Sequence, residues 1–284
     1  MKKVLTFVGK IAVTSALSII IYSFLLEDDS SGSERKVKTK LYSNILDEER
    51  EVIVHLPLDY DSTKKYPVMY VLDGGSQDDH IATKFDVLSS AGYSPKTIVV
   101  GIPNMSAINR ELNLTPPFIR SNNDDPNSDL GDGDKFLKFM ESELFPFIEG
   151  QFAASQTRLL SGNSRGGLLV MYSLLYSPDL FQARFCYTTP FWRQDNILAL
   201  KVTELLHSTD TLTTFLYMSA GENETDNIKN GLDKMKERLK DNAPAGFIFY
   251  ADYTPHAIHQ NNAMISSSIG IARWSEHYKL TNRN

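Results

Sequence analysis

The sequence predicts an α/β fold in which a mostly parallel central sheet is covered by helices on both faces. From residue 37 onward, short β-rich apolar runs alternate with longer runs of helical period. Several of the short runs are apolar throughout, as expected for strands that are buried on both faces. The chain has 284 residues, of which 42% are hydrophobic and 23% charged, which is enough for one large globular domain.

Seven segments have the composition of strands, because β-branched and aromatic residues dominate them and turn-forming residues bound them. In chain order they are residues 51–57, 67–73, 97–103, 158–162, 183–189, 213–221 and 246–252.

Four longer segments have helical periodicity, and they fall between or after these strands. They are residues 134–148, 166–176, 226–242 and 261–279. The polar, turn-rich stretch 120–134 is predicted to be a surface loop near the mouth of a site. No repeat and no second domain boundary is evident, so we expect residues 37–284 to form a single catalytic domain.

The first 26 residues differ from the rest of the chain. Lys2 and Lys3 precede an apolar stretch from Val4 to Leu26, which only Lys10 interrupts. This pattern predicts an N-terminal signal anchor or a signal peptide, and the lack of a small-residue cleavage motif favours the anchor. The polar residues 27–36 are interpreted as a tether. The charge pattern predicts an exported protein, with the domain in the periplasm or another extracytoplasmic space.

Charge and cysteine content exclude several classes of function. The net charge of −6 argues against a nucleic-acid partner. The single cysteine, Cys186, allows no intrachain disulfide and lies in an apolar run, so it is predicted to be a core residue. The chain has no clustered cysteine and histidine ligands, so no metal is expected.

The pentapeptide GNSRG at residues 162–166 is the strongest candidate for a catalytic motif. A predicted strand ends at Gly162 and a predicted helix starts at Gly166, with Ser164 at the apex. This strand–turn–helix arrangement is a nucleophile elbow, and glycines two residues either side of the serine would avoid a collision at its strained turn. We interpret Ser164 as a nucleophile; the alternative is a loop serine that caps a helix.

A serine nucleophile needs a base and an acid, which follow in chain order in this class of site. His256 and His259 lie after the strand 246–252 and before the last helix, and the residues alone leave both open as the base. The acid is expected just after the strand 213–221, at Glu222, Glu224 or Asp226. Glu224 is preferred because it lies three residues after the strand's glycine, and Glu222 is the runner-up.

The oxyanion hole requires two backbone amides. One is expected from Arg165, the residue after the nucleophile, and the other from the loop after the strand 67–73. In that loop we favour Gly75 over Gly74, and His80 could line the site without being the base. This mechanism needs no cofactor.

Four stretches of the sequence resemble the putative esterase family of α/β hydrolases, which includes esterase-D-like enzymes, siderophore esterases and mycolyltransferases. They are VIVHLPLDYDSTKKYPVMYVLDGG, NRELNLTP, LLSGNSRGGLLVMYSLLYSPDLF and TTPFWRQDN. The resemblance runs from about residue 40 to residue 275. It implies the α/β-hydrolase fold and a serine esterase activity.

The resemblance also bears on the choice of base and acid. The family places its base histidine after a proline and about eleven residues before a glycine, a spacing that Pro255, His259 and Gly270 satisfy. It therefore selects His259 over His256. The family's acid position falls within residues 222–224 and supports Glu224 or Glu222.

Three residues depart from the family pattern. Asn163 stands where histidine is common, and its side chain is expected to point away from the substrate. Arg165 stands where small or apolar residues are usual; we expect it to form a solvent-facing salt bridge, the alternative being that it favours an anionic substrate. Asn113 replaces an aspartate in the segment NLTP.

The sequence thus predicts a serine esterase that hydrolyses a small-molecule carboxylic ester through an acyl-enzyme intermediate. A siderophore-type ester, an acylated sugar and a short acyl ester all fit as substrates. Two alternatives are an acyltransferase with the same triad and a non-catalytic ligand-binding homologue. The oligomeric state is left open.

Overall fold

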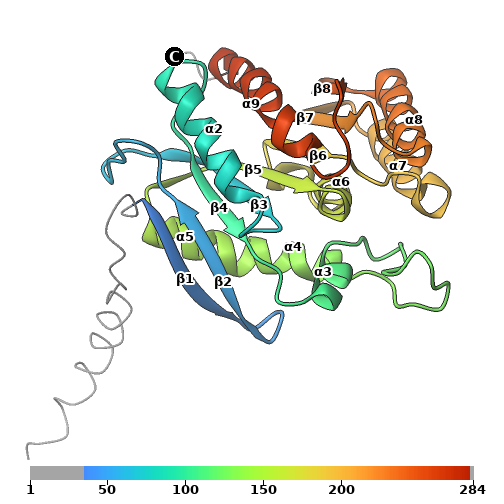
Figure 1. The fold of residues 1–284 in the computed structure, drawn as a ribbon, viewed down its shortest axis with the longest axis horizontal. Coiled ribbons are helices and arrows are strands. Elements are labelled where there is room, and N and C mark those ends of the chain that lie inside the picture. Colours follow the sequence, from blue (N-terminus) through green and yellow to red (C-terminus); the bar gives the residue numbers. More distant parts are fainter. Residues whose placement is uncertain (1–34, 282–284) are drawn as a thin grey trace, which may run out of the picture. The chain divides into compact units, whose positions relative to one another are not determined.

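Within the residues that the computed structural model describes, 35–281, eight strands form one sheet in the order β1-β2-β4-β3-β5-β6-β7-β8 (Figure 1). The strands are β1 (Lys36–Ser43), β2 (Glu48–His55), β3 (Tyr66–Leu72), β4 (Ile98–Ile102), β5 (Ala154–Asn163), β6 (Ala183–Tyr187), β7 (Thr211–Gly221) and β8 (Ala245–Thr254). The pairs β1–β2 and β2–β4 are antiparallel, and the strands from β4 to β8 pair in parallel. The predicted mostly parallel sheet is confirmed.

The apolar strands are buried on both faces, as their composition predicts. In β3, Val68, Tyr70 and Leu72 pack into one core cluster, whereas Met69 and Val71 pack into the cluster on the opposite face. This division follows from the period of two in a strand, which sends successive side chains to opposite sides of the sheet.

Helices cover both faces of the sheet (Figure 1). The smaller core cluster lies under α2 (Asp78–Ser90) and α9 (Asn262–Thr281). The larger cluster lies under α4 (Gly133–Phe139), α5 (Phe145–Gln151), α6 (Arg165–Tyr176), α7 (Arg193–His207) and α8 (Asp226–Asn242). The short helix α3 (Ala107–Asn113) and the 3₁₀ turn η2 (Pro178–Leu180) lie in connecting segments.

The four predicted helices are present, but one of them is not a regular α-helix. The segment predicted at 134–148 consists of α4, a π-helical stretch η1 (Met140–Leu144) and α5. Pro146 lies at the start of α5 and has no amide hydrogen to donate to the preceding turn. The wider π-helical turn before it accommodates this missing bond.

Sequence periodicity missed the strand β1 and the helices α2, α3 and α7. The strand β1 alternates lysines with less polar residues and lies at the sheet edge, where one neighbour is enough. Its first residue, Lys36, was assigned to the tether and belongs to the sheet. Helix α2 buries only Asp78, Ile81 and Phe85, which is too few apolar residues for a helical pattern to be visible.

The predicted signal anchor or signal peptide, residues 1–26, lies outside the described residues, as does the tether up to residue 34. Within residues 35–281, none of the helices is both long and apolar enough to span a membrane.

Candidate active site

Ser164 occupies a sharp turn between β5 and α6, as the motif predicts. Its backbone lies at φ 53° and ψ −119°, a strained region for a residue other than glycine. The Ser164 amide donates a hydrogen bond to the carbonyl of Tyr187 at the end of β6, with a distance of 2.8 Å. The turn is therefore held by the neighbouring strand and presents the serine at the carboxyl edge of the sheet.

The glycines that must lack a side chain at this turn are not the two that the motif predicts. A Cβ at Gly162 would lie within 3.0 Å of the Gly166 backbone, so Gly162 must lack a side chain. A Cβ at Gly166 would meet its nearest neighbour, Leu72, at an ordinary distance of 3.5 Å, which contradicts the expectation for that position. The second position that requires glycine is Gly167, where a Cβ would overlap Thr189.

His259 lies next to Ser164. Its Nε2 is 3.0 Å from Ser164 Oγ, and its Nδ1 is 3.2 Å from Glu224 Oε2. His256, the other candidate base, is exposed and adopts a left-handed φ of 57° in the turn after β8. The structure therefore brings together Ser164, His259 and Glu224 from three separate parts of the chain.

The three candidate acids have different surroundings. The Glu224 side chain is 2% exposed and faces His259. Glu222 instead accepts a hydrogen bond from the His256 amide at 3.1 Å. Asp226 begins α8, where its side chain is 89% exposed and forms an ion pair with Lys229 at 3.3 Å. Only Glu224 is within hydrogen-bonding distance of the candidate base.

This arrangement is suited to proton transfer from the serine. A carboxylate that accepts the Nδ1 proton of a histidine leaves Nε2 free to accept the proton of a hydroxyl group. His259 faces Ser164. In a non-catalytic homologue, we would expect this histidine to turn away from the serine.

The amides expected to form the oxyanion hole differ in whether they already have a hydrogen-bond partner. Arg165 is the first residue of α6, so its amide has no partner within the helix and lies at the positive end of the helix dipole. The Gly75 amide donates to Asp78 Oδ1 at 2.6 Å, and the Gly74 amide donates to the Ile102 carbonyl at 3.0 Å. The second donor stays a prediction, because both amides already have partners.

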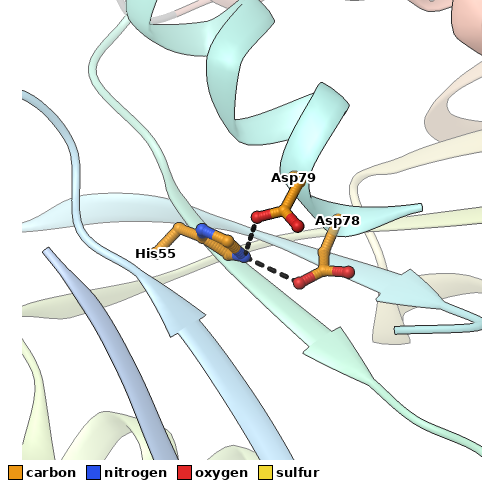
Figure 2. Close-up of side chains that lie close together, drawn as sticks. All are labelled: His55, Asp78 and Asp79. Carbon is orange, nitrogen blue, oxygen red and sulfur yellow. Dashed lines mark hydrogen bonds and ion pairs between the residues drawn. The ribbon is translucent and has the colours of Figure 1, made fainter. Parts of the chain in front are cut away.

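Asp78 is held in turn by His55 from strand β2 (Figure 2). His55 Nε2 is 2.7 Å from Asp78 Oδ2 and 3.8 Å from Asp79 Oδ1. Burial opposes ionisation of Asp78, but its hydrogen bonds with His55 and the Gly75 amide hold its pKa below the usual value. These three side chains offer ligand atoms within 4.8 Å of one another. Their present partners, including Lys36 on Asp79 at 2.6 Å, satisfy the same atoms, so we interpret the cluster as the support of the Gly75 loop.

The Arg165 side chain is not solvent-facing, which contradicts the expectation. It is 16% exposed, and its Nη1 donates to Thr115 Oγ1 at 2.9 Å and to the Ser121 carbonyl at 2.5 Å. Its ion pair with Glu111 is long, at 3.8 Å. Arg165 thus ties the start of the polar loop 120–134 to the elbow, as expected for a loop near the mouth of a site.

A polar cavity of about 410 Å³ reaches the elbow through Asn163. Its lining includes Asp73, Gly74, Gln77, Asn104, Arg110 and Asn163. Asn163, which was expected to point away from the substrate, is thus part of a cavity wall. His80 lines a narrower inner space that shares Gln77 and Asn163 with this cavity. Periodicity and motif spacing gave no signal for Gln77, Asn104 or Arg110.

Comparison with known proteins identifies the family. The family model described as "Putative esterase" matches residues 43–259. The crystal structure of an IroE-like serine hydrolase from Shewanella oneidensis is 29% identical, with a TM-score of 0.77 over 86% of this chain and 81% of that chain. The BES protein from Bacillus cereus has the same fold, with a TM-score of 0.77, 22% identity and coverage of 88% of this chain and 99% of that one.

Among curated proteins, the "Uncharacterized protein YjcH" of Bacillus subtilis (strain 168) is 25% identical over 195 residues, which are 66% of this chain and 72% of that protein. The "Ferri-bacillibactin esterase BesA" of the same organism is 31% identical over 135 residues, 41% of this chain and 45% of the relative. Since the family model covers most of residues 35–281, the chain belongs to the putative esterase family and is a carboxylic ester hydrolase with the α/β-hydrolase fold.

Proposed function

We propose that this protein hydrolyses carboxylic esters with a Ser164–His259–Glu224 triad and an acyl-enzyme intermediate. The observation that carries the proposal is the pair of distances at His259, 3.0 Å to Ser164 Oγ and 3.2 Å to Glu224 Oε2. The likeness to a serine hydrolase of 29% identity adds support.

In the first half of the reaction, Ser164 Oγ attacks the ester carbonyl carbon while His259 Nε2 takes the hydroxyl proton. Glu224 holds the imidazole and stabilises the imidazolium that forms. The Arg165 amide stabilises the oxyanion, and the proposed second donor, the Gly75 amide, exchanges its bond to Asp78 Oδ1 for one to the oxyanion. The bond to the leaving oxygen then breaks, and His259 gives its proton to the departing alcohol. A water molecule then attacks the acyl-enzyme carbonyl while His259 takes its proton. The bond to Ser164 Oγ breaks, His259 returns the proton to Ser164, and the carboxylic acid is released.

The proposed substrates are polar esters, of which siderophore-type esters are one class. Two observations support this substrate class. The cavity beside Asn163 is lined mostly by polar and charged residues. In addition, the ferri-bacillibactin esterase of Bacillus subtilis is a relative over part of the chain.

Hydrolysis of p-nitrophenyl acetate and butyrate by the full-length protein tests the triad. Ser164→Ala and His259→Ala should each lower kcat by at least about 10³-fold, with little change in KM. Mass spectrometry should detect an acyl adduct on the peptide that contains Ser164. Full activity in either variant would overturn the mechanism.

Two neighbouring carboxylates provide a matched test of the acid. Glu224→Ala should lower kcat by about 10³ to 10⁴-fold, because it removes the partner of His259 Nδ1. Glu222→Ala should keep most of the activity, since Glu222 contacts only the His256 amide near the base. The opposite ranking of these variants would assign the acid to Glu222.

The proposed location of the enzyme is extracytoplasmic, and it rests on the sequence of residues 1–26 alone. A fusion of residues 1–36 to a phosphatase that is active only after export tests this location. Active phosphatase in the membrane fraction would support an anchor, and active soluble phosphatase a cleaved signal. Phosphatase that is inactive, although the fusion accumulates, would contradict export.

A further inference from the structure

One residue in the wall of the cavity beside the elbow carries an unpaired hydrogen-bond acceptor. Asn163 Oδ1 is buried and has no hydrogen-bond partner among the described residues. Burying such an atom without a partner costs about 1–3 kcal/mol. Asn163 lines the cavity as well as the tightly packed region behind it, and because its Oδ1 is buried, its amide group must turn toward the cavity before a bound molecule can donate to it.

Gln77 provides a hydrogen-bond donor on the same cavity wall, and its orientation follows from its neighbours. Lys84 Nζ lies 3.1 Å from His80 Nδ1 and 2.5 Å from the Met264 carbonyl. An ammonium group only donates, so Nδ1 of His80 must accept. The proton of a neutral His80 therefore sits on Nε2, which lies 3.2 Å from Gln77 Oε1.

The protonation states required by this chain of bonds are the favoured ones. Burial and the neighbouring Lys84 lower the pKa of His80 to about 4, so its ring is neutral at pH 7. Burial lowers the pKa of Lys84 to about 8, so its amine is still mostly protonated at that pH. The amide oxygen of Gln77 is thus engaged by His80, and its NH₂ group has no protein partner within residues 35–281.

The charged groups of the cavity wall are already paired with each other. Arg110 donates to both carboxylate oxygens of Asp73, at 2.6 and 2.8 Å, and Asn104 donates to the same carboxylate at 2.5 Å. A carboxylate on the substrate would compete with Asp73 for Arg110, whereas an uncharged polar group meets no such competition.

We propose that the cavity is a substrate subsite for an uncharged group that carries an acceptor and a donor side by side, as a primary carboxamide does. The Gln77 NH₂ group donates to the oxygen of that carboxamide, and Asn163 Oδ1 accepts its N–H. His80 and Lys84 are positioning residues that fix the direction of the Gln77 amide. This inference rests on the proposed ester hydrolysis and specifies which esters are preferred.

Two matched ester pairs test the subsite in the full-length protein. The first pair is the p-nitrophenyl esters of succinamic acid and of 4-methylpentanoic acid, which have the same shape with and without a primary carboxamide. The second pair places the carboxamide in the alcohol half: the butyrates of 4-hydroxybutanamide and of 4-methylpentan-1-ol. The amide also changes the chemical reactivity of an ester, so the informative quantity is the change in the amide-to-alkyl ratio of kcat/KM between wild type and variants.

Two substitutions of Gln77 separate its donor from its bulk. Gln77→Glu retains the shape and an acceptor for His80 but removes the NH₂ donor. Gln77→Met removes both polar atoms. In at least one pair, each should lower the amide-to-alkyl ratio by about fivefold or more, the effect of losing one neutral hydrogen bond. Asn163→Leu should lower the same ratio through loss of the acceptor. Gln151→Leu is the control, because it makes a similar change at an exposed residue at the end of α5.

The outcomes separate this inference from the proposed function. If Ser164-dependent hydrolysis occurs but the ratio in both pairs is unchanged in Gln77→Glu and Asn163→Leu, the subsite is wrong and the esterase stands. If no ester is hydrolysed in a Ser164-dependent way, both proposals are overturned. A lower activity with an unchanged ratio would assign Gln77 a structural role only, and it also overturns the subsite.

Discussion

Two adjacent glycines in the first turn of α6 should respond in opposite ways to the same substitution. In Gly167→Ala, the added Cβ would lie 2.9 Å from the Thr189 Cβ and closer still to its hydroxyl oxygen. Thr189 is 3% exposed, and rotation of its side chain can move the hydroxyl oxygen but not the Cβ. In Gly166→Ala, the nearest atom is Leu72 Cβ at 3.5 Å, an ordinary contact.

The expected free energies follow from these distances. Overpacking of a rigid core site costs about 3 kcal/mol, and replacing a helical glycine by alanine returns about 1 kcal/mol. Gly167→Ala should therefore destabilise the protein by about 2 kcal/mol. Gly166→Ala has only the favourable contribution and should stabilise it by up to about 1 kcal/mol.

Equilibrium unfolding in urea, followed by circular dichroism, measures the difference between the two variants. We expect Gly167→Ala to unfold at a lower urea concentration than wild type, and Gly166→Ala at the same or a higher one. Thr189→Ala in the Gly167→Ala background removes the closest atom and should restore part of the stability. Equal midpoints for the two single variants, or a lower midpoint for Gly166→Ala, would refute the reasoning.

Two further predictions concern residues near the elbow. His80 has a folded-state pKa of about 4 against an ordinary 6.5, so the unfolded chain takes up its proton first and the native state loses stability as the pH falls through that interval. This loss is at most about 3 kcal/mol. The urea midpoints at pH 7 and pH 4.5 should therefore differ less in His80→Leu than in wild type. An equal difference in the two proteins would contradict the lowered pKa of His80. Arg165→Met removes the bonds to Thr115 and Ser121, so amide hydrogen exchange in the loop 120–134 should become faster. Unchanged exchange would show that the loop does not depend on Arg165.

The elbow could be predicted from the sequence because its signal is local. A strand, a sharp turn and a helix follow one another within about 20 residues, so Ser164 is recognisable from its neighbours. His259 required a family resemblance, since His256 stands three residues earlier in the same loop. What distinguishes the two is a left-handed φ at His256, which no spacing rule reports.

The residues that sequence reasoning missed act across the fold. His55 reaches from strand β2 to Asp78 at the start of α2, and Arg110 reaches Asp73 over 37 positions in the chain. Such pairs leave no periodic pattern, because each partner alone is an ordinary polar residue in its element. The place of Asn163 in a cavity wall was missed for a related reason: the wall is formed largely by the loop after β3, which is distant in sequence.

The positions of Glu222 and Glu224 show how one contact separates two candidate acids. Gly221 ends β7, and a Cβ there would collide with the Ala257 carbonyl, so the loops after β7 and β8 approach each other closely at this point. The Asn223 amide donates to that carbonyl at 3.0 Å and locks the approach. Glu222 is then directed toward the His256 amide, and Glu224 follows after the turn, facing His259. A larger residue at position 221 should therefore separate the two loops and weaken catalysis through the distance between His259 and Glu224, although it touches neither side chain.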